Sequence, residues 1–179
     1  MDPVELLLHP VRLRIVHALS GGRSLTTQQL CERISDASKA TVYRHVALLA
    51  EAGILEESAQ QRVRGFVERH YRLRPARAAV SAQRAAAATL EEHRRAFAAA
   101  MAALLAEYGT YLDDPDADPA RDQVGYRQHA VWLTDAERDE LIAGMRAAIV
   151  PHLSHEPGPG RMQHLLSPIL FPIERHHED

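Results

Sequence analysis

The chain has 179 residues, and its content of 46% hydrophobic and 25% charged residues is typical of a soluble globular protein with a packed core. Aromatic residues make up only 5%, and alanine supplies much of the apolar content, which predicts a mostly helical protein. A single cysteine, Cys31, excludes an intramolecular disulfide. The first residues do not resemble a signal peptide, and no apolar run reaches the roughly 18 residues of a membrane span, so we expect a cytoplasmic protein without membrane contact.

The net charge of −3 is divided unevenly along the chain. Residues 1–77 contain 12 Lys and Arg against 8 Asp and Glu, a net charge of +4, whereas residues 78–179 contain 9 against 16, a net charge of −7. A positive segment can neutralise phosphates and a negative one cannot. We therefore expect any contact with nucleic acid in the first half of the chain and a different role for the second half.

Three helices are predicted in the first part of the chain. The first begins at Pro10, where an apolar pattern of helical spacing starts. Thr26 and Gln29 form a capping-box pattern at the start of the second, because the hydroxyl can accept from a backbone N–H while the amide reaches back. Ser38 is the expected N-cap of the third helix, which Gly53 ends.

The third predicted helix has two different faces. Val42, Val46 and Leu49 recur at about one turn, which predicts a buried face. The other side chains point away from this face, and most of them can reach a phosphate or a base edge. These outward residues are Lys39, Thr41, Tyr43, Arg44 and Ala47.

Two strands are predicted to follow, at residues 54–57 and 66–73, and a polar hairpin tip that carries Arg62 and Arg64 joins them. A hairpin with arginines at its tip, placed directly after a helix-turn-helix, is typical of a wing. We therefore predict that residues 1–75 form a winged helix-turn-helix DNA-binding domain.

Residues 76–112 are predicted to form one continuous helix, because they are rich in alanine and carry an apolar stripe from Leu90 to Tyr111. A helix with such a stripe needs a partner, so we assign it to dimerisation or to a link between domains. The acidic, proline-containing residues 113–119 interrupt the helix and predict a loop.

Residues 113–179 are predicted to form a small α+β region that serves as an effector or dimer-contact domain. Two segments, 124–133 and 165–173, have strand character and could pair with each other. Between them a capping box at Thr134 opens a helix that we expect to end at Pro151. The inward positions of that helix would be Leu141, Ile142, Met145 and Ile149.

The run from Ser38 to Leu55 resembles the recognition helix of winged-helix repressors of the arsenic-repressor (ArsR) type, with its hydroxyl-rich start and its Ala-Gly-Ile-Leu exit. The run from Leu8 to Val16, with its His-Pro-x-Arg start, resembles the opening helix of the same group. The resemblance covers roughly residues 5–75. It implies a homodimer on double-stranded DNA, with each recognition helix in a major groove and half-sites about one helical turn apart.

The resemblance also implies which residues contact DNA. The recognition helix would present its outward side, with His45 able to contact either a phosphate or a base, and the wing would present its arginines. The start of the supporting helix would offer backbone N–H groups to phosphate. The residues concerned are Thr26, Thr27, Gln28, Ser38, Lys39, Thr41, Tyr43, Arg44, His45, Arg62 and Arg64.

Metal sensing is a less favoured hypothesis. Many metal-sensing members of this group carry Cys-x-Cys at the recognition helix, and this chain has only Cys31, which we expect to be a small buried residue of the second helix. Histidine ligands are the alternative, either His152 with His155 and Glu156 or the chain end at residues 176–179. A metal site needs three or four converging ligands, so we expect no metal.

Three aromatic residues in the acidic half, Tyr111, Tyr126 and Trp132, are candidates for an effector cavity, with core packing as the simpler interpretation. The sequence contains no Gly-rich phosphate loop, no Gly-x-Ser-x-Gly and no His-Glu-x-x-His, so we expect neither an enzyme nor a cofactor. The favoured function is a homodimeric transcriptional repressor with effector-modulated DNA affinity. The alternative is a helix-turn-helix that binds protein without specific DNA binding.

Overall fold

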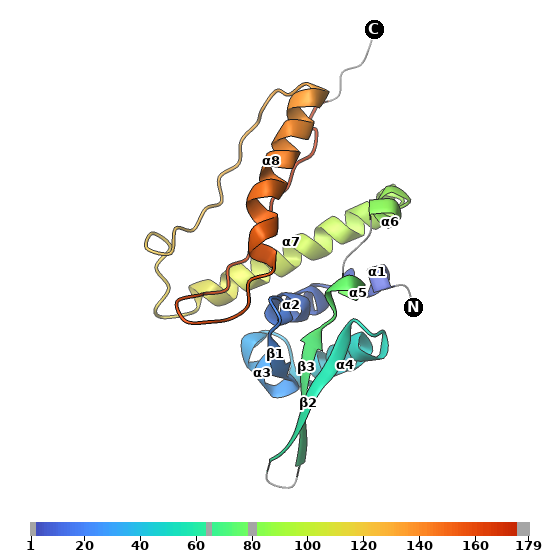
Figure 1. Cartoon of the computed structure of the whole chain (residues 1–179), viewed down its shortest axis with the longest axis vertical. Coiled ribbons are helices and arrows are strands. Elements are labelled where there is room, and N and C mark those ends of the chain that lie inside the picture. The colour runs from blue at the N-terminus through green and yellow to red at the C-terminus, as the bar shows by residue number, and fades with distance from the viewer. Residues whose placement is uncertain (1–2, 64–65, 79–81, 175–179) are drawn as a thin grey trace.

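The computed structural model describes residues 3–63, 66–78 and 82–174 (Figure 1). It is mostly helical with one small antiparallel sheet, which confirms the predicted fold class. In chain order its elements are α1 (Pro3–Leu7), α2 (Pro10–Leu19), β1 (Ser24–Thr26), α3 (Thr27–Arg33), α4 (Lys39–Glu51), β2 (Leu55–Val63), β3 (Phe66–Leu73), α5 (Pro75–Ala78), α6 (Ala82–Ala86), α7 (Leu90–Leu112) and α8 (Asp135–Leu153).

One hydrophobic core holds the N-terminal helices and the sheet together. Ile15 of α2 and Leu30 of α3 are fully buried in it, together with Val42 and Leu49 of α4. Each such side chain contributes roughly 1.5–3 kcal/mol through removal from water. The three helices and the buried face of α4 thus form as the apolar spacing predicted.

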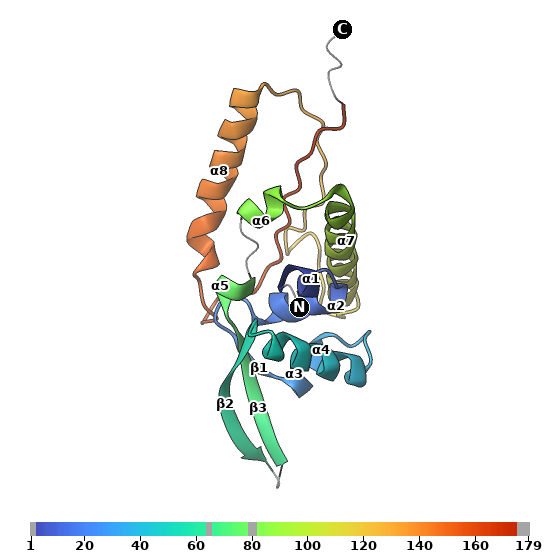
Figure 2. The same ribbon diagram turned by 90° about the vertical axis from the view of Figure 1, so that its right-hand side faces the viewer.

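The sheet has the strand order β1-β3-β2, and its long hairpin projects away from the helices (Figures 1 and 2). Pairing of β2 with β3 continues to Val63, opposite Phe66, so the first strand of the wing is longer than predicted. Arg62 therefore lies on a paired strand opposite Val67, not in a loop. The predicted tip residue Arg64 lies outside the described residues.

The predicted continuous helix over residues 76–112 is wrong. The structure divides this segment into α5, α6 and α7, and α7 begins only after Thr89. The Thr89 hydroxyl accepts from the Glu92 backbone N–H at 3.2 Å, and the Glu92 carboxylate accepts from the Thr89 N–H at 2.7 Å. This capping box fixes a helix start where alanine content alone favours continuation.

The predicted C-terminal α+β region is also wrong in its β component, since residues 124–133 and 165–173 contain no strand. The helix between them continues past Pro151 to Leu153. None of its residues is buried, and its expected inward positions Leu141 and Ile142 are exposed. The other two, Met145 and Ile149, are only half-buried, so the described residues form no closed core around this helix.

Helix α7 packs across α2, where Ala99 and Ala103 are buried, whereas α8 stands apart from both (Figure 2). Small side chains at this contact allow the two helix axes to approach closely. The described helices include none that is long and apolar enough to cross a membrane.

Candidate nucleic-acid interface

The start of α3 is fixed by the capping box that the sequence predicts. The Gln29 N–H donates to the Thr26 hydroxyl at 3.2 Å, and the Thr26 N–H donates to the Gln29 side chain at 2.9 Å. Thr26 is buried, so its side chain supports the helix and does not face solvent. Thr27 is half-buried and Gln28 is exposed, which leaves these two at the surface of the helix N-terminus.

Helix α4 begins at its predicted N-cap. The Ser38 hydroxyl accepts from the Thr41 backbone N–H at 3.2 Å and lies 2.8 Å from the Thr41 hydroxyl. Both hydroxyls therefore have a local partner, and Thr41 is half-buried. The N-cap holds the backbone of the first turn of α4 in place, and Lys39 is the first residue of that turn.

One face of α4 is fully open to solvent. Lys39, Tyr43, Arg44 and Ala47 are exposed on it, with 54% of Tyr43 accessible. Lys39 and Arg44 form no ion pair with any residue in the described part of the chain. Their charges are therefore available to an external anion, and the phenol beside them adds a hydrogen-bonding group.

His45 lies on the opposite side of α4, so the structure removes it from the candidate DNA contacts. It is only 4% exposed, and its ring centroid lies 4.3 Å from that of His9. Burial, followed by the neighbouring His9, Arg12 and Arg44, lowers the pKa of His45 to about 4. Neither ring nitrogen has a hydrogen-bond partner among the described residues, and the ring is neutral at pH 7.

Arg12 of α2 is a cation near this site that the sequence analysis did not single out. Burial and the positive charge of Arg44 lower the pKa of Arg12, which shows that the two guanidinium groups repel each other. An anion bound beside Arg44 would relieve this repulsion. The His-Pro-x-Arg pattern could have indicated the position of Arg12. His9 caps α2 by accepting from the Val11 N–H at 3.2 Å, and Arg12 follows within the first turn.

The arginines of the wing differ in how far their charge is already compensated. Arg72 and Arg74 both bind Glu56, and they lower the pKa of that carboxyl. Arg69 pairs with Glu57 at 3.6 Å. Arg62 is exposed and forms no ion pair with a described residue, so it is the arginine of β2 and β3 best able to meet a phosphate.

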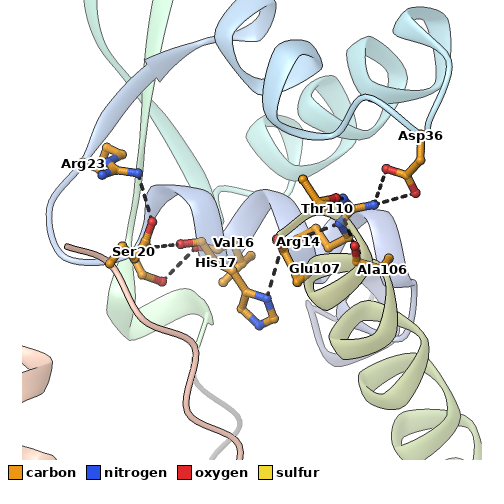
Figure 3. Close-up of polar contacts among 10 residues, drawn as sticks. Arg14, Val16, His17, Ser20, Arg23, Asp36, Ala106, Glu107 and Thr110 are labelled. Atoms are coloured by element: carbon orange, nitrogen blue, oxygen red, sulfur yellow. Dashed lines mark hydrogen bonds and ion pairs between the residues drawn. The ribbon is translucent and has the colours of Figure 1, made fainter. Parts of the chain in front are cut away.

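A buried arginine joins the helix-turn-helix to α7 (Figure 3). Arg14 of α2 is 1% exposed, and its Nη1 donates to both carboxylate oxygens of Asp36 at 2.6 and 2.8 Å. Its Nη2 donates to the Thr110 hydroxyl at 3.1 Å, and its Nε lies 3.6 Å from Glu107. Asp36 lies in the turn before α4, so this cluster ties α7 to the segment that positions the exposed face.

The structure places only two of the three aromatic candidates for an effector cavity, Tyr111 and Tyr126, near each other. Tyr108 stacks on Tyr111 at 5.9 Å and contacts Tyr126 at 6.4 Å between ring centroids. The Tyr111 hydroxyl donates to Asp122 at 2.9 Å, and burial followed by this bond raises the pKa of Tyr111 to about 12. Trp132 is 79% exposed and makes no ring contact with the described aromatic residues. An effector cavity at these residues stays a prediction.

Cys31 is buried on α3, as predicted, and burial raises the pKa of its thiol. Within residues 3–63, 66–78 and 82–174, no group of three or more His, Cys, Asp or Glu side chains is arranged to hold a metal ion. The rings of His152 and His155 meet edge to face at 5.2 Å. The other histidine cluster, at residues 176–179, lies outside the described residues.

Comparison with known families agrees with this geometry. The model of a family described as a helix-turn-helix domain matches residues 7–58, from the end of α1 into β2. A search of curated proteins found no match. The matched segment contains α2, α3 and α4, so the helix-turn-helix predicted from the sequence is confirmed.

Proposed function

We propose that the chain is a homodimeric, sequence-specific transcriptional repressor that binds double-stranded DNA through α4 and the wing, because residues 7–58 match a helix-turn-helix domain and the same region resembles the ArsR type. The observation that carries this proposal is the exposed face of α4, on which Lys39 and Arg44 have no ion-pair partner among the described residues. An α-helix fits the major groove of B-DNA, where arginine can bind guanine through two hydrogen bonds.

The proposal divides the contacts into two kinds. Arg44 and Tyr43, on the exposed face of α4, would read base edges, whereas Arg62 on the wing would meet phosphates. Lys39 lies in the first turn of α4 and would add a phosphate contact there. The starts of α3 and α4 would contact DNA through Thr27, Gln28, Ser38 and Thr41. Thr26 and His45 are buried and would only support the helices that make these contacts.

The test is a fluorescence-anisotropy titration of the full chain against its own upstream DNA and against random DNA, at two salt concentrations. We expect Arg44→Ala to cost about 1–3 kcal/mol of binding free energy to the preferred site and to relax sequence preference. Arg62→Ala should weaken binding to all sequences and lower the salt slope by about one unit. Arg94→Ala, an exposed arginine of α7, is the matched control and should change neither quantity.

Two outcomes would contradict the proposal. Binding to upstream DNA no tighter than to random DNA would exclude a sequence-specific regulator. Equal effects of Arg44→Ala and Arg62→Ala on preference and on salt slope would exclude the division into base and phosphate contacts. Capture of a protein partner at high salt without any DNA shift would instead favour a protein-binding module.

Modulation by an effector is proposed on the basis of the Arg14 cluster. Glu107 and Thr110 of α7 contact Arg14, which in turn holds Asp36 in the turn before α4. A displacement of α7 would therefore change the support of the exposed face of α4. An effector that binds one position of α7 better than another would shift DNA affinity by its differential binding free energy.

A further inference from the structure

The C-terminal arm, residues 124–174, exposes apolar surface along its whole length. It consists of α8 and two extended segments, 125–133 and 164–173, and most of the exposed large hydrophobic side chains of the described residues lie in it. The most exposed of them include Tyr126, Trp132, Leu153, Leu166 and Ile173. Large exposed apolar surfaces on a globular protein commonly mark sites that a partner covers.

The arm is nevertheless held in a definite position by its own chain. At its start the Tyr126 ring contacts Tyr108 of α7. Farther along, the Gln163 amide donates to the His17 carbonyl at 2.7 Å and accepts from Arg23 at 2.9 Å, and Phe171 meets Phe97 at 6.5 Å between ring centroids. Between these anchors α8 stands away from the rest of the molecule (Figures 1 and 2).

The two extended segments have unpaired backbones. In the described part of the chain, no backbone hydrogen bond joins residues 125–133 or 164–173 to another segment. Strand-like apolar segments with free N–H and C=O groups pair readily with a further strand. The sequence predicts strands here, and the described part of one chain supplies no second strand for them to pair with.

The exposed area is large enough for a stable dimer. At roughly 100 Å² for each of about fifteen partly exposed large side chains, the arm presents on the order of 1,500 Å² of mainly apolar surface per copy. A typical specific interface buries only about 800 Å² per partner. A second copy of the arm presents a surface of the same size, so the two arms together supply enough area for a stable dimer.

Helix α8 has an uneven charge distribution. Its first two turns carry four acidic residues and Arg138, whereas its second half, which ends at Leu153, carries one charged residue, Arg146. In an antiparallel pair the two acidic starts lie at opposite ends of the pair, so they avoid the like-charge repulsion that a parallel pair would create. Near the middle, a Cβ added to Gly144 would meet no atom within 4 Å, so the centre of α8 offers space for a close helix approach.

We propose that the C-terminal arm is the dimer interface: α8 packs antiparallel against α8 of a second copy, and the segments 125–133 and 164–173 of the two copies complete a shared sheet. This places the main interface in residues 124–174, not on the stripe of α7 that the sequence suggested. It deepens the homodimer of the proposed function, but it rests on the arm alone and not on any DNA contact.

The first experiment is light scattering coupled to size-exclusion chromatography on the full chain without DNA. We expect a mass twice the 19.9 kDa of one chain. Trp132→Glu and Leu166→Glu, both on exposed positions of the arm, should shift the mass toward that of one chain. Leu105→Glu, at an exposed position of α7, is the control and should leave the dimer intact. A wild-type monomer, or a dimer lost only in Leu105→Glu, would overturn the proposal.

A cross-linking experiment tests the helix pair without disrupting it. In a Cys31→Ala background, Gly144→Cys should form a disulfide-linked dimer on mild oxidation, because a disulfide needs Cα atoms only about 4.4–6.8 Å apart. Val67→Cys, at an exposed position of the wing, should remain uncross-linked. A dimer that cross-links at neither site would overturn the antiparallel pairing of α8.

The two proposals can fail separately. If the arm variants are monomers and the wild-type dimer binds no specific DNA, the interface stands and the regulator proposal fails. If the wild type binds specific DNA and the arm variants remain dimeric, the interface is refuted and the regulator proposal stands.

Discussion

Replacement of the buried Arg14 tests whether its cluster stabilises the junction between α2, α4 and α7. Arg14→Met keeps much of the aliphatic stem and removes the guanidinium, which donates three hydrogen bonds to Asp36 and Thr110. Loss of one partner of a fully buried ion pair costs about 3–5 kcal/mol. Asp36 is exposed and can regain water, and the desolvation penalty of the arginine itself disappears, so we expect a smaller loss of about 2 kcal/mol.

The assay is equilibrium unfolding of the full chain in urea at a fixed protein concentration, with Arg94→Met on the exposed side of α7 as the matched control. Arg14→Ala should cost more than Arg14→Met, because it also removes buried methylene groups worth roughly 0.8 kcal/mol each. A double-mutant cycle of Arg14→Met with Thr110→Val measures the bond between α2 and α7 directly. An Arg14→Met protein within 0.5 kcal/mol of wild type would refute the idea that this cluster stabilises the junction.

Three further results are expected. The pKa of His45 is lowered from 6.5 to about 4, so its contribution to stability is complete above pH 6.5 and declines toward pH 4. Urea unfolding at pH 5 should therefore give a free energy of unfolding on the order of 1 kcal/mol lower than at pH 7. His45→Leu should reduce this difference. Thr89→Ala should destabilise α7 by about 1 kcal/mol in the same assay, whereas an unchanged midpoint would show that the cap is unimportant. Cys31 should react with a thiol reagent only slowly in the folded protein and rapidly in urea; equal rates would contradict its burial.

The elements of the N-terminal region could be predicted because their signals are local. Thr26 and Ser38 each cap the helix that directly follows them, and the apolar spacing of α4 identifies its buried face. The same spacing also predicts that His45 is buried, because it lies three residues after Val42 and four before Leu49. We expected a DNA contact there because histidine is polar, although the helical period places this residue in the core.

Other features depend on contacts between residues that are distant in the sequence. Arg14 is buried because Thr110, 96 positions later, supplies a partner, and no local pattern reveals such a pairing. The start of α7 at Thr89 had a local signal in its capping box, but the surrounding alanines outweighed it in the prediction. The predicted strands at residues 124–133 and 165–173 do not form, because periodicity indicates a strand without showing which segment it pairs with, and these two segments form no backbone hydrogen bonds to each other.

The last turns of α7 connect the two halves of the molecule. On one side, Glu107 and Thr110 contact Arg14, which holds the turn before α4; on the other, Tyr108 contacts Tyr126 at the start of the arm. In the proposed dimer each arm is fixed against its partner, so these same turns would transmit the geometry of the interface to the two copies of α4. The distance between the exposed α4 faces of the two copies would then depend on how the arms pack. Helix α7 contacts both Arg14 and the arm, so as a rigid element it cannot move against one without moving the other. Any ligand that alters the packing of the arm would therefore act on DNA affinity through the contact between α7 and Arg14.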